Sequence, residues 1–371
     1  MHRILLLFLF FLLPLQLQAA DYANPTLKVL LLSSKGMVKF TSMSGIEVYG
    51  AKKPMNPPKV LNLQYLGNSQ VQIGNFSKSK KPFFLVSSKP IRIYQGRRSY
   101  KYEGEIEIRP YKGGFSVINH IAVESYLEGV LNAEISTKWN FEVVKAQAIL
   151  ARTYAVKKAR ERRNRSWHLK SDQTDQVYKG VGLSDEIAKE AIDATRGFVV
   201  NYRGRLAQIF YHSSCGGTTE DPGNLWKNGY PYYQVKEVPF GREDPNYNWK
   251  FFISNAKMRQ ILNQAGAKGA TGIEIYERNG SNRAQEMIST GPVEKVISAK
   301  NFRRLVGYTK VKSLLFDISQ QGGGFVVEGR GSGHGVGMCQ WAGKEMADLG
   351  YTYYDILYYF YDGVEIEVYN L

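Results

Sequence analysis

The chain has 371 residues, 43% of them hydrophobic and 22% charged, which suits one large or two modest globular domains. This composition excludes a disordered or a collagen-like chain. Lys and Arg total 49 against 33 Asp and Glu, a net charge of +16, and such a chain favours polyanionic surroundings. The two cysteines, Cys215 and Cys339, are too few for a disulfide scaffold and form no CxxC pattern.

The first twenty residues have the pattern of an export signal. Arg3 precedes ten apolar residues, 4–13, and the small pair 19–20 follows. The apolar run is too short to cross a bilayer. We predict a signal peptide over residues 1–20 and an exported protein in the periplasm or cell envelope, anchored to the membrane if the signal stays uncleaved. An exported chain of this charge is expected to meet anionic envelope polymers and not nucleic acid.

The region after the signal is predicted to be β-rich over residues 21–95, because short apolar runs alternate there with Gly, Pro, Ser and Asn. The expected strands lie at 27–32, 45–51, 71–76, 90–94, 103–109 and 115–118. Helices are expected from Val123 onward. The clearest follows Asn140, a good N-cap, because apolar residues then recur at spacings of three and four.

The remainder mixes both element types. Helices are expected at 184–196, 255–265 and 298–306, and from residues 338 and 352. Strands are expected at 198–202, 206–211, 273–278, 284–289, 325–328 and 364–369, with Asn279-Gly280 as a hairpin turn. Strands and helices follow one another without a βαβ rhythm, so we predict an α+β fold.

A glycine-rich stretch runs from Gly329 to Gly337, with glycine at every second position. It matches neither the dinucleotide-binding GxGxxG pattern nor a Walker loop. Alternating glycines let the backbone approach another group closely and leave His334 as the only titratable ring of the stretch. We therefore expect His334 to have a functional role, although a plain strand-to-helix turn would have the same composition.

The segment His212–Gly217 ends a strand and brings a second histidine and the first cysteine. With His334 and Cys339 it would offer a metal two His and two Cys, but the spacing lacks the CxxC or HxxxH pattern typical of zinc. A nucleophilic pair of Cys215 with His212 or His334 is another interpretation. A disulfide in an oxidising compartment and buried free thiols are two more.

Carboxylates ahead of the long helix are candidates for acid–base chemistry. Glu134 stands between apolar neighbours, so partial desolvation should raise its pKa and suit it to general acid work. Glu124 and Glu128 lie four residues apart on one helix face, where a solvated surface is the simpler interpretation. The residues alone do not separate Glu134 strongly from these two.

Several segments in the same order resemble the stage II sporulation protein D (SpoIID)/LytB family of peptidoglycan lytic transglycosylases. The segments are 121–130, with IAVESYLEGV, Ala133-Glu134-Ile135, 145–155, with KAQAILARTYA, 172–178, with DQTDQVY, 212–217, with HSSCGG, and 331–341, with GSGHGVGMCQW. Together they cover residues 96–371, which the resemblance makes the catalytic domain. Residues 21–95 have no counterpart.

The resemblance implies a lyase that cleaves glycan strands, with Glu134 as the catalytic residue. It assigns substrate-binding positions to Gln147, Arg152, Tyr154, Tyr178, His212, His334, Gln340 and Trp341. Some members hold zinc near the segment matching 168–178 through one His and two Cys. Here His168 remains without those cysteines, so we expect no metal and no cofactor.

The same resemblance has two further implications. The family brings the turns that carry Cys215 and Cys339 near the cleft, so we predict a disulfide between them. Other relatives are described as modifiers of amidases, which makes an N-acetylmuramoyl-L-alanine amidase a candidate partner beside the glycan strands. It also leaves open a non-catalytic role as a glycan-binding protein or amidase activator.

Overall fold

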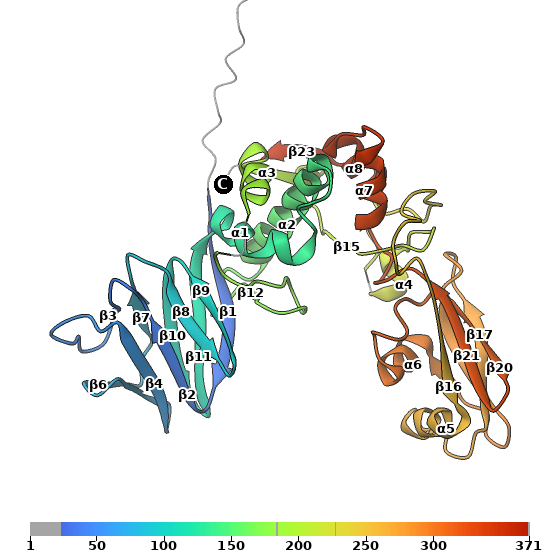
Figure 1. The fold of residues 1–371 in the computed structure, drawn as a ribbon, viewed down its shortest axis with the longest axis horizontal. Helices are drawn as coiled ribbons and strands as arrows, with labels where there is room; N and C mark the ends of the chain where they lie inside the picture. Colours follow the sequence, from blue (N-terminus) through green and yellow to red (C-terminus); the bar gives the residue numbers. More distant parts are fainter. Residues whose placement is uncertain (1–23, 183–184, 227, 370–371) are drawn as a thin grey trace, which may run out of the picture.

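The computed structural model describes residues 24–182, 185–226 and 228–369 and confirms the α+β fold. The chain forms an arch (Figure 1). An N-terminal limb, residues 24–122, and an inserted limb, residues 248–330, extend from a crown of residues 123–247 and 331–369. The predicted signal peptide lies outside the described residues. Within them, every helix is too short or too polar to span a bilayer.

The N-terminal limb consists of two six-stranded sheets, ordered β12-β1-β11-β10-β7-β3 and β6-β5-β4-β2-β8-β9. Their strands are β1 (Thr26–Ser34), β2 (Met37–Thr41), β3 (Glu47–Tyr49), β4 (Val60–Gly67), β5 (Gln70–Ile73), β6 (Ser77–Ser79), β7 (Phe83–Val86), β8 (Ile91–Gln95), β9 (Arg98–Tyr102), β10 (Glu105–Tyr111), β11 (Gly114–Ala122) and β12 (Leu169–Lys170). Alternate side chains such as Leu61 and Leu63 are buried between the sheets. Because β9, β10 and β11 belong to these sheets, the limb extends to Ala122, beyond the boundary expected near residue 95.

The crown is organised around one long helix. Its helices are α1 (Val123–Glu134), α2 (Phe141–Glu161), α3 (Glu186–Ala194), α4 (Pro222–Leu225), α7 (Gln340–Asp348) and α8 (Tyr353–Phe360). The side chain of Asn140 accepts the backbone N–H of Glu142 at 3.0 Å, the predicted N-cap. Ala148, Ala151 and Ala155 are fully buried, and such small side chains let α1, α3, α7 and α8 pack closely around α2.

Short strands complete the crown. They are β13 (Phe198–Tyr202), β14 (Arg205–Leu206), β15 (Tyr211–His212), β22 (Met338–Cys339) and β23 (Glu365–Val368). β13 pairs with β14 and β23, and β15 pairs in parallel with β22. The strand expected over 206–211 therefore survives only at its two ends. The helix expected from residue 184 begins at Glu186, and residue 184 itself lies outside the described part.

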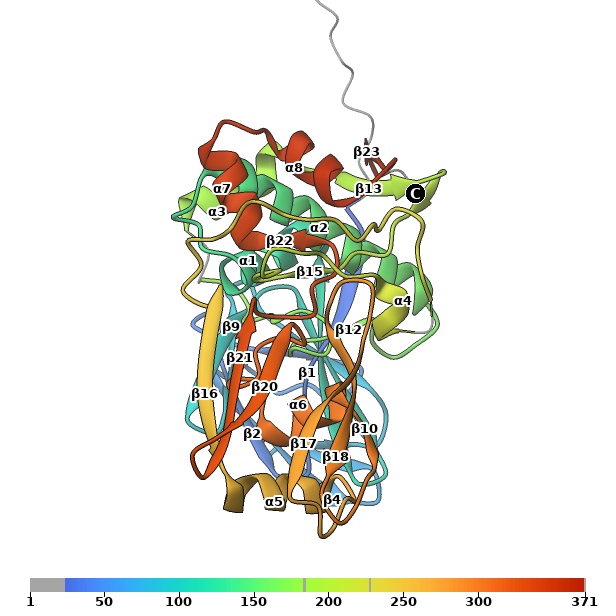
Figure 2. The same cartoon turned by 90° about the vertical axis from the view of Figure 1, so that its right-hand side faces the viewer.

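The inserted limb has a hydrophobic core of its own. Its elements are β16 (Asn248–Ser254), α5 (Asn255–Gln264), β17 (Gly272–Arg278), β18 (Ala284–Thr290), β19 (Val296–Ser298), α6 (Ala299–Val306), β20 (Phe316–Gln321) and β21 (Gly324–Arg330). The hairpin predicted around Asn279-Gly280 is confirmed by the pairing of β17 with β18. Figure 2 shows that both limbs extend from the same side of the crown.

Candidate active site

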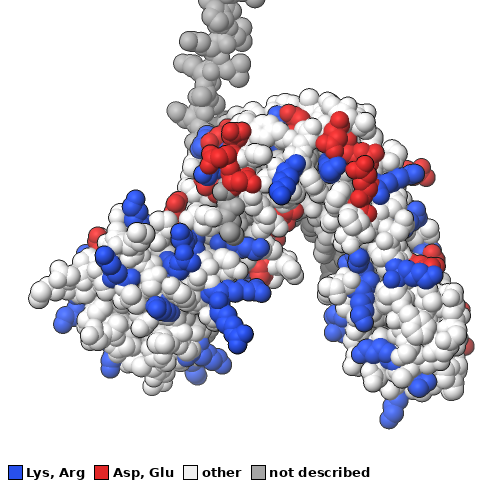
Figure 3. All heavy atoms as spheres, viewed as in Figure 1, with Lys and Arg blue, Asp and Glu red and all other residues white. Residues whose placement is uncertain are grey.

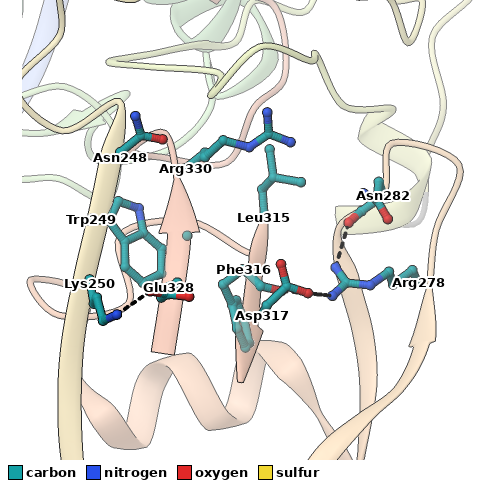
Figure 4. Close-up of a pocket in the computed structure, with 11 residues that line it drawn as sticks. Asn248, Trp249, Lys250, Arg278, Asn282, Leu315, Phe316, Asp317, Glu328 and Arg330 are labelled. Atoms are coloured by element: carbon teal, nitrogen blue, oxygen red, sulfur yellow. Dashed lines mark hydrogen bonds and ion pairs between the residues drawn. The ribbon is translucent and has the colours of Figure 1, made fainter. Parts of the chain in front are cut away.

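Several hollows open on the described surface, and one of them lies in the inserted limb (Figure 4). It has a volume of about 440 Å³. Its charged side chains are engaged with one another: Lys250 pairs with Glu328 at 2.5 Å, and Arg278 pairs with Asp317. Both carboxylates that line this hollow are therefore already paired with cations.

The second hollow is a cleft of about 390 Å³ in the crown. Its lining comes from the end of α1, from α2, from the segment after β12, from β15 and from the turns that carry Trp226 and His334. In Figure 1 β15 lies at the top of the gap between the limbs, and Figure 3 shows that this gap is open. A long polymer could therefore reach the crown from between the limbs.

Glu134 is the last residue of α1, and its side chain lines this cleft. Its carboxylate accepts the backbone N–H of Val177 at 3.2 Å and a hydrogen bond from the Tyr211 hydroxyl. Burial raises the pKa of Glu134, and these two hydrogen bonds oppose the increase. On the backbone side, Gln340 Nε2 donates to the Glu134 carbonyl at 2.9 Å and holds the helix end in place.

The second carboxylate in the lining, Asp175, is already committed. It accepts hydrogen bonds from Tyr154 at 2.9 Å, from Arg162 at 3.1 Å and from the backbone N–H of Lys170 at 2.9 Å. A carboxylate held by a cation and two further donors is already engaged within the fold. Among the described lining residues, Glu134 is therefore the one carboxyl group that no cation holds.

His334 lines the cleft as expected, but its ring is fixed by the backbone on both sides. Its Nδ1 accepts the N–H of Val336 at 3.0 Å, and its other ring nitrogen hydrogen-bonds the backbone of Tyr211. Burial lowers its pKa to about 3, so the ring is neutral. His334 is consequently a rigid wall of the cleft and a poor general base.

An aromatic surface faces the acid. The rings of Phe210 and Trp226 stack at 4.2 Å, and the His334 ring meets Trp226 edge-on at 5.4 Å. Trp226 is 41% exposed, so part of its ring stays open to the cleft. Rigid, open aromatic faces offer large apolar contact areas at low entropic cost, a suitable platform for the C–H faces of a sugar.

Two predicted substrate contacts are not in the cleft. Arg152 is fully buried and forms a bidentate ion pair with Glu124 at 2.9 and 2.8 Å. Gln147 is also fully buried, and its Oε1 accepts from Gln340 Nε2 at 3.1 Å. Both therefore stabilise the packing around α2 and hold the acid's helix, and Glu124 is not the solvated carboxylate that its helical spacing suggested.

The other predicted positions divide between the cleft and its surroundings. Tyr154 lines the cleft, with its hydroxyl on Asp175. Tyr178 is 2% exposed, bonds Asn119 at 2.9 Å and borders a neighbouring hollow. The Trp341 ring packs on Trp139 at 4.8 Å and does not line the cleft.

His212, Cys215 and Cys339 lie together, buried beside the cleft. Both cysteines are free thiols, so the structure does not contain the predicted disulfide. The two cysteines nevertheless lie close together, because β15 and β22 pair with His212 opposite Cys339. Their hydrogen-bonded contact in a buried pocket does not require a covalent bond. His212 is 4% exposed and does not contact the cleft.

Several cleft residues were not among the predicted site residues, and three of them lie near the acid or the aromatic wall. Tyr211 directly precedes His212, Gln176 lies inside the matching segment 172–178, and Trp226 follows α4. Gln176 Nε2 lies 3.3 Å from the Tyr211 hydroxyl, and so connects the two loops that flank the acid. Their positions inside or beside family motifs were the available signal.

The chain is similar in sequence to known proteins. The family model described as "Stage II sporulation protein" matches residues 111–202, which include α1, α2 and Glu134. The chain is 30% identical over 285 residues to an uncharacterised protein of Brachyspira hyodysenteriae, covering 73% of each chain. It is 27% identical to the stage II sporulation protein D of Bacillus subtilis, over 76% of this chain and 84% of that protein.

A further relative is the amidase enhancer of Bacillus subtilis, which is 25% identical over 66% of this chain and 40% of that protein. The segment that carries Glu134 thus lies within the matched family model, and the chain's relatives include stage II sporulation proteins. This chain belongs to the SpoIID family.

Proposed function

We propose that the protein is an exported peptidoglycan lytic transglycosylase. It cleaves glycan strands between N-acetylmuramic acid and N-acetylglucosamine and leaves 1,6-anhydro ends. The observation that supports this is the single available acid, Glu134, whose pKa is raised by burial in an open cleft with an aromatic wall. Family membership supports a role on the cell wall.

One carboxyl group suffices for this reaction. A hydrolytic glycosidase needs a second carboxylate as nucleophile or as base for water. In the proposed reaction, the protonated Glu134 donates its proton to the glycosidic oxygen as the C1–O bond breaks. The C6 hydroxyl of the same muramic acid then bonds to C1 and gives its proton to the Glu134 carboxylate, which restores the acid. General acid–base catalysis of this kind contributes about 10²–10⁴-fold.

The surrounding residues would hold the sugar and the carboxyl group of Glu134 in the relative position that the reaction needs. Tyr211 and the Val177 N–H orient the carboxyl group, and Gln340 fixes the helix end behind it. Trp226 and His334 form the wall on which a sugar ring can pack. Close positioning converts the attack of the C6 hydroxyl into a favourable intramolecular step.

The positive net charge of the chain suits a second contact, with anionic polymers of the cell envelope. Glycan stripped of its peptides is close to neutral, so the net charge of +16 would act on anionic envelope polymers and not on the scissile strand. An amidase that strips the peptides is the natural partner of such an activity. The chemistry described for Glu134 uses no cofactor.

The test is a turnover assay on purified glycan strands, with and without prior amidase digestion. Products are analysed by mass spectrometry for anhydromuramyl ends. We expect such ends with the wild-type chain, and more of them on digested strands. Reducing ends in place of anhydro ends would indicate hydrolysis and overturn the proposal.

A non-catalytic role is the second candidate, because the chain is 25% identical to a protein named amidase enhancer. In that role the cleft would bind glycan, and Glu134 would only form a hydrogen bond. Strand binding without new chain ends, together with faster release of peptides by an added amidase, would favour it.

A further inference from the structure

We propose that His212, Cys215 and Cys339 bind one zinc ion beside the cleft. The possible ligand atoms of the three residues all lie within 4.8 Å of one another, and all three residues are buried. Two thiolates and one imidazole are donors that zinc prefers, in tetrahedral coordination. Three protein donors leave one further position, which a water can fill.

The fold brings these donors together from distant parts of the chain. The parallel pairing of β15 with β22 sets His212 opposite Cys339, and the N–H of Cys215 lies 3.2 Å from the Cys339 sulfur. The CxxC and HxxxH patterns did not indicate this cluster, because they detect only ligands that are close together along the chain. This site also differs in place from the segment around His168, where the resemblance would put a metal.

The imidazole of His212 is oriented as a ligand. Its Nδ1 lies 3.1 Å from the Val336 carbonyl oxygen, which can only accept, so this nitrogen carries the proton. The lone pair is then on Nε2, which is buried and, among the described residues, has only the Cys215 thiol to interact with. A thiol is a weak hydrogen-bond donor, so it satisfies a buried ring nitrogen poorly. Metal-bound histidines usually donate their other N–H to a carbonyl or carboxylate.

The glycine-rich stretch makes room for this arrangement. Gly333 has φ +116°, and an added Cβ there would lie 2.8 Å from the Cβ of His212. A larger residue at position 333 would clash with His212 and push the two turns apart. It would also be strained, because residues with a side chain rarely adopt this positive φ. The glycine therefore lets the turn before β22 lie directly against His212, which keeps Cys339 within reach of the other donors.

The local charges leave a place for a dication. Arg283 is 1% exposed, and its guanidinium donates to the Cys215 carbonyl at 3.0 Å and to the Thr218 carbonyl at 2.7 Å. The carboxylate of Glu220, which is also 1% exposed, balances that cation. Arg283 also lies near both cysteines, but one cation that already faces Glu220 cannot neutralise two adjacent thiolates, which would repel each other. Zinc neutralises both as each thiol gives up its proton to solvent.

A zinc ion here would support the candidate active site from behind. It would tie the turn after β15 to Cys339, and the next residue is Gln340, which holds the Glu134 carbonyl. The ion itself would not reach the cleft, because none of its three ligands lines it. This inference differs from the expectation of a metal-free protein and does not depend on glycan cleavage.

The experiment measures metal in the full chain, purified under reducing conditions without chelator. We expect about one zinc per chain by elemental mass spectrometry. Replacing zinc with Co²⁺ should give a thiolate-to-cobalt charge-transfer band. Cys215→Ser, Cys339→Ser and His212→Gln should each lose the ion, whereas the matched control His168→Gln should keep it.

Three results would overturn the proposal. One is a wild-type chain without zinc in which both thiols react freely after unfolding. Another is a zinc-free chain whose mass shows the two cysteines joined by a disulfide. The third is full zinc content in both serine variants. If a variant fails to fold, the wild-type stoichiometry and cobalt spectrum still decide whether the thiols bind metal.

Discussion

The limbs and the crown of the arch differ in charge. The N-terminal limb has sixteen Lys or Arg against four Asp or Glu, and the inserted limb has thirteen against six. The crown has nineteen against twenty-two, so it is the acidic part of a basic chain. Figure 3 shows blue side chains spread over both limbs and red ones gathered on the crown.

The crown also uses acids in its interior. Glu124 is buried in an ion pair with Arg152, and Glu134 is largely desolvated at the end of the same helix. One acid stabilises the crown and the other is available for chemistry. Under the proposed function, the basic limbs would hold the protein at an anionic polymer while the crown acts on glycan.

The largest effect should come from Glu134→Gln, which keeps the shape of the side chain and removes its proton. Turnover of glycan strands should fall by about 10²-fold or more, since general acid–base catalysis is lost. Glu128→Gln is the matched control, because Glu128 lies on the same helix outside the cleft lining. Near-normal turnover in the Glu134 variant, with an inactive Glu128 variant, would move the assignment.

The next effect concerns stability. Glu124→Gln leaves the fully buried Arg152 without its carboxylate, and an unpaired buried charge costs about 3–5 kcal/mol. Urea unfolding should show this loss in the free energy of unfolding. In the control, Glu161→Gln removes an exposed carboxylate that pairs with Lys158 at 3.1 Å, and should cost under about 1 kcal/mol. Equal losses would mean that the buried pair has no special role.

Helix α2 and the Glu124–Arg152 ion pair show what the sequence could and could not predict. The position of α2 followed from its N-cap and its apolar spacing, both of which are local properties. The partner of Glu124 did not follow, because Arg152 lies 28 residues away on another helix and the pairing depends on tertiary packing. Motif resemblance named Arg152 and Gln147 as substrate-binding positions, but it could not tell a buried support from a cleft wall.

The proximity of Cys215 and Cys339 also depends on contacts between residues far apart in the sequence. Their proximity comes from β15 and β22, two strands of two residues each, whose pairing no periodicity reveals. The expected N-terminal boundary near residue 95 differs from the extent of the limb's sheets, because strand patterns do not show which sheet a strand joins. By contrast, the Asn279-Gly280 hairpin was found because its turn chemistry is local.

Charge removal tests the limbs directly. The triple variant Lys78→Gln, Lys80→Gln and Lys81→Gln neutralises exposed residues of the N-terminal limb. Binding to an anionic polymer such as teichoic acid, measured by co-sedimentation at low salt, should weaken about tenfold, since each Lys near an anionic surface contributes up to roughly 1 kcal/mol. Turnover of soluble stripped glycan should stay unchanged.

The control for this variant removes the same charge from the crown. Arg160, Arg163 and Arg165 are exposed near the end of α2, and their replacement by Gln should weaken binding less, because the crown is acidic overall. Equal weakening would mean that net charge alone, and not the limb, holds the polymer.

The joint between the limb and the crown should respond to acid. His168 Nδ1 accepts the N–H of Lys28 at 3.2 Å, and burial lowers its pKa to about 4, against 6.5 for a free histidine. The unfolded chain therefore binds this proton more readily. The stability contributed by neutral His168 is complete above pH 6.5 and is lost as the pH falls toward 4. Melting temperatures across this range should fall less steeply in His168→Gln, and an unchanged slope would contradict the assignment.

The smallest effect should be a shift in a pH profile. The Tyr211 hydroxyl lowers the pKa of Glu134, and burial raises it. Tyr211→Phe removes the lowering influence, so the carboxyl group should stay protonated to higher pH. Because the reaction needs the protonated acid, the alkaline limb of the kcat/KM profile should move upward. Tyr154→Phe is the control, since that hydroxyl bonds Asp175, and its profile should keep the wild-type position. A downward shift in the Tyr211 variant would show that this tyrosine does not act on the acid of the crown.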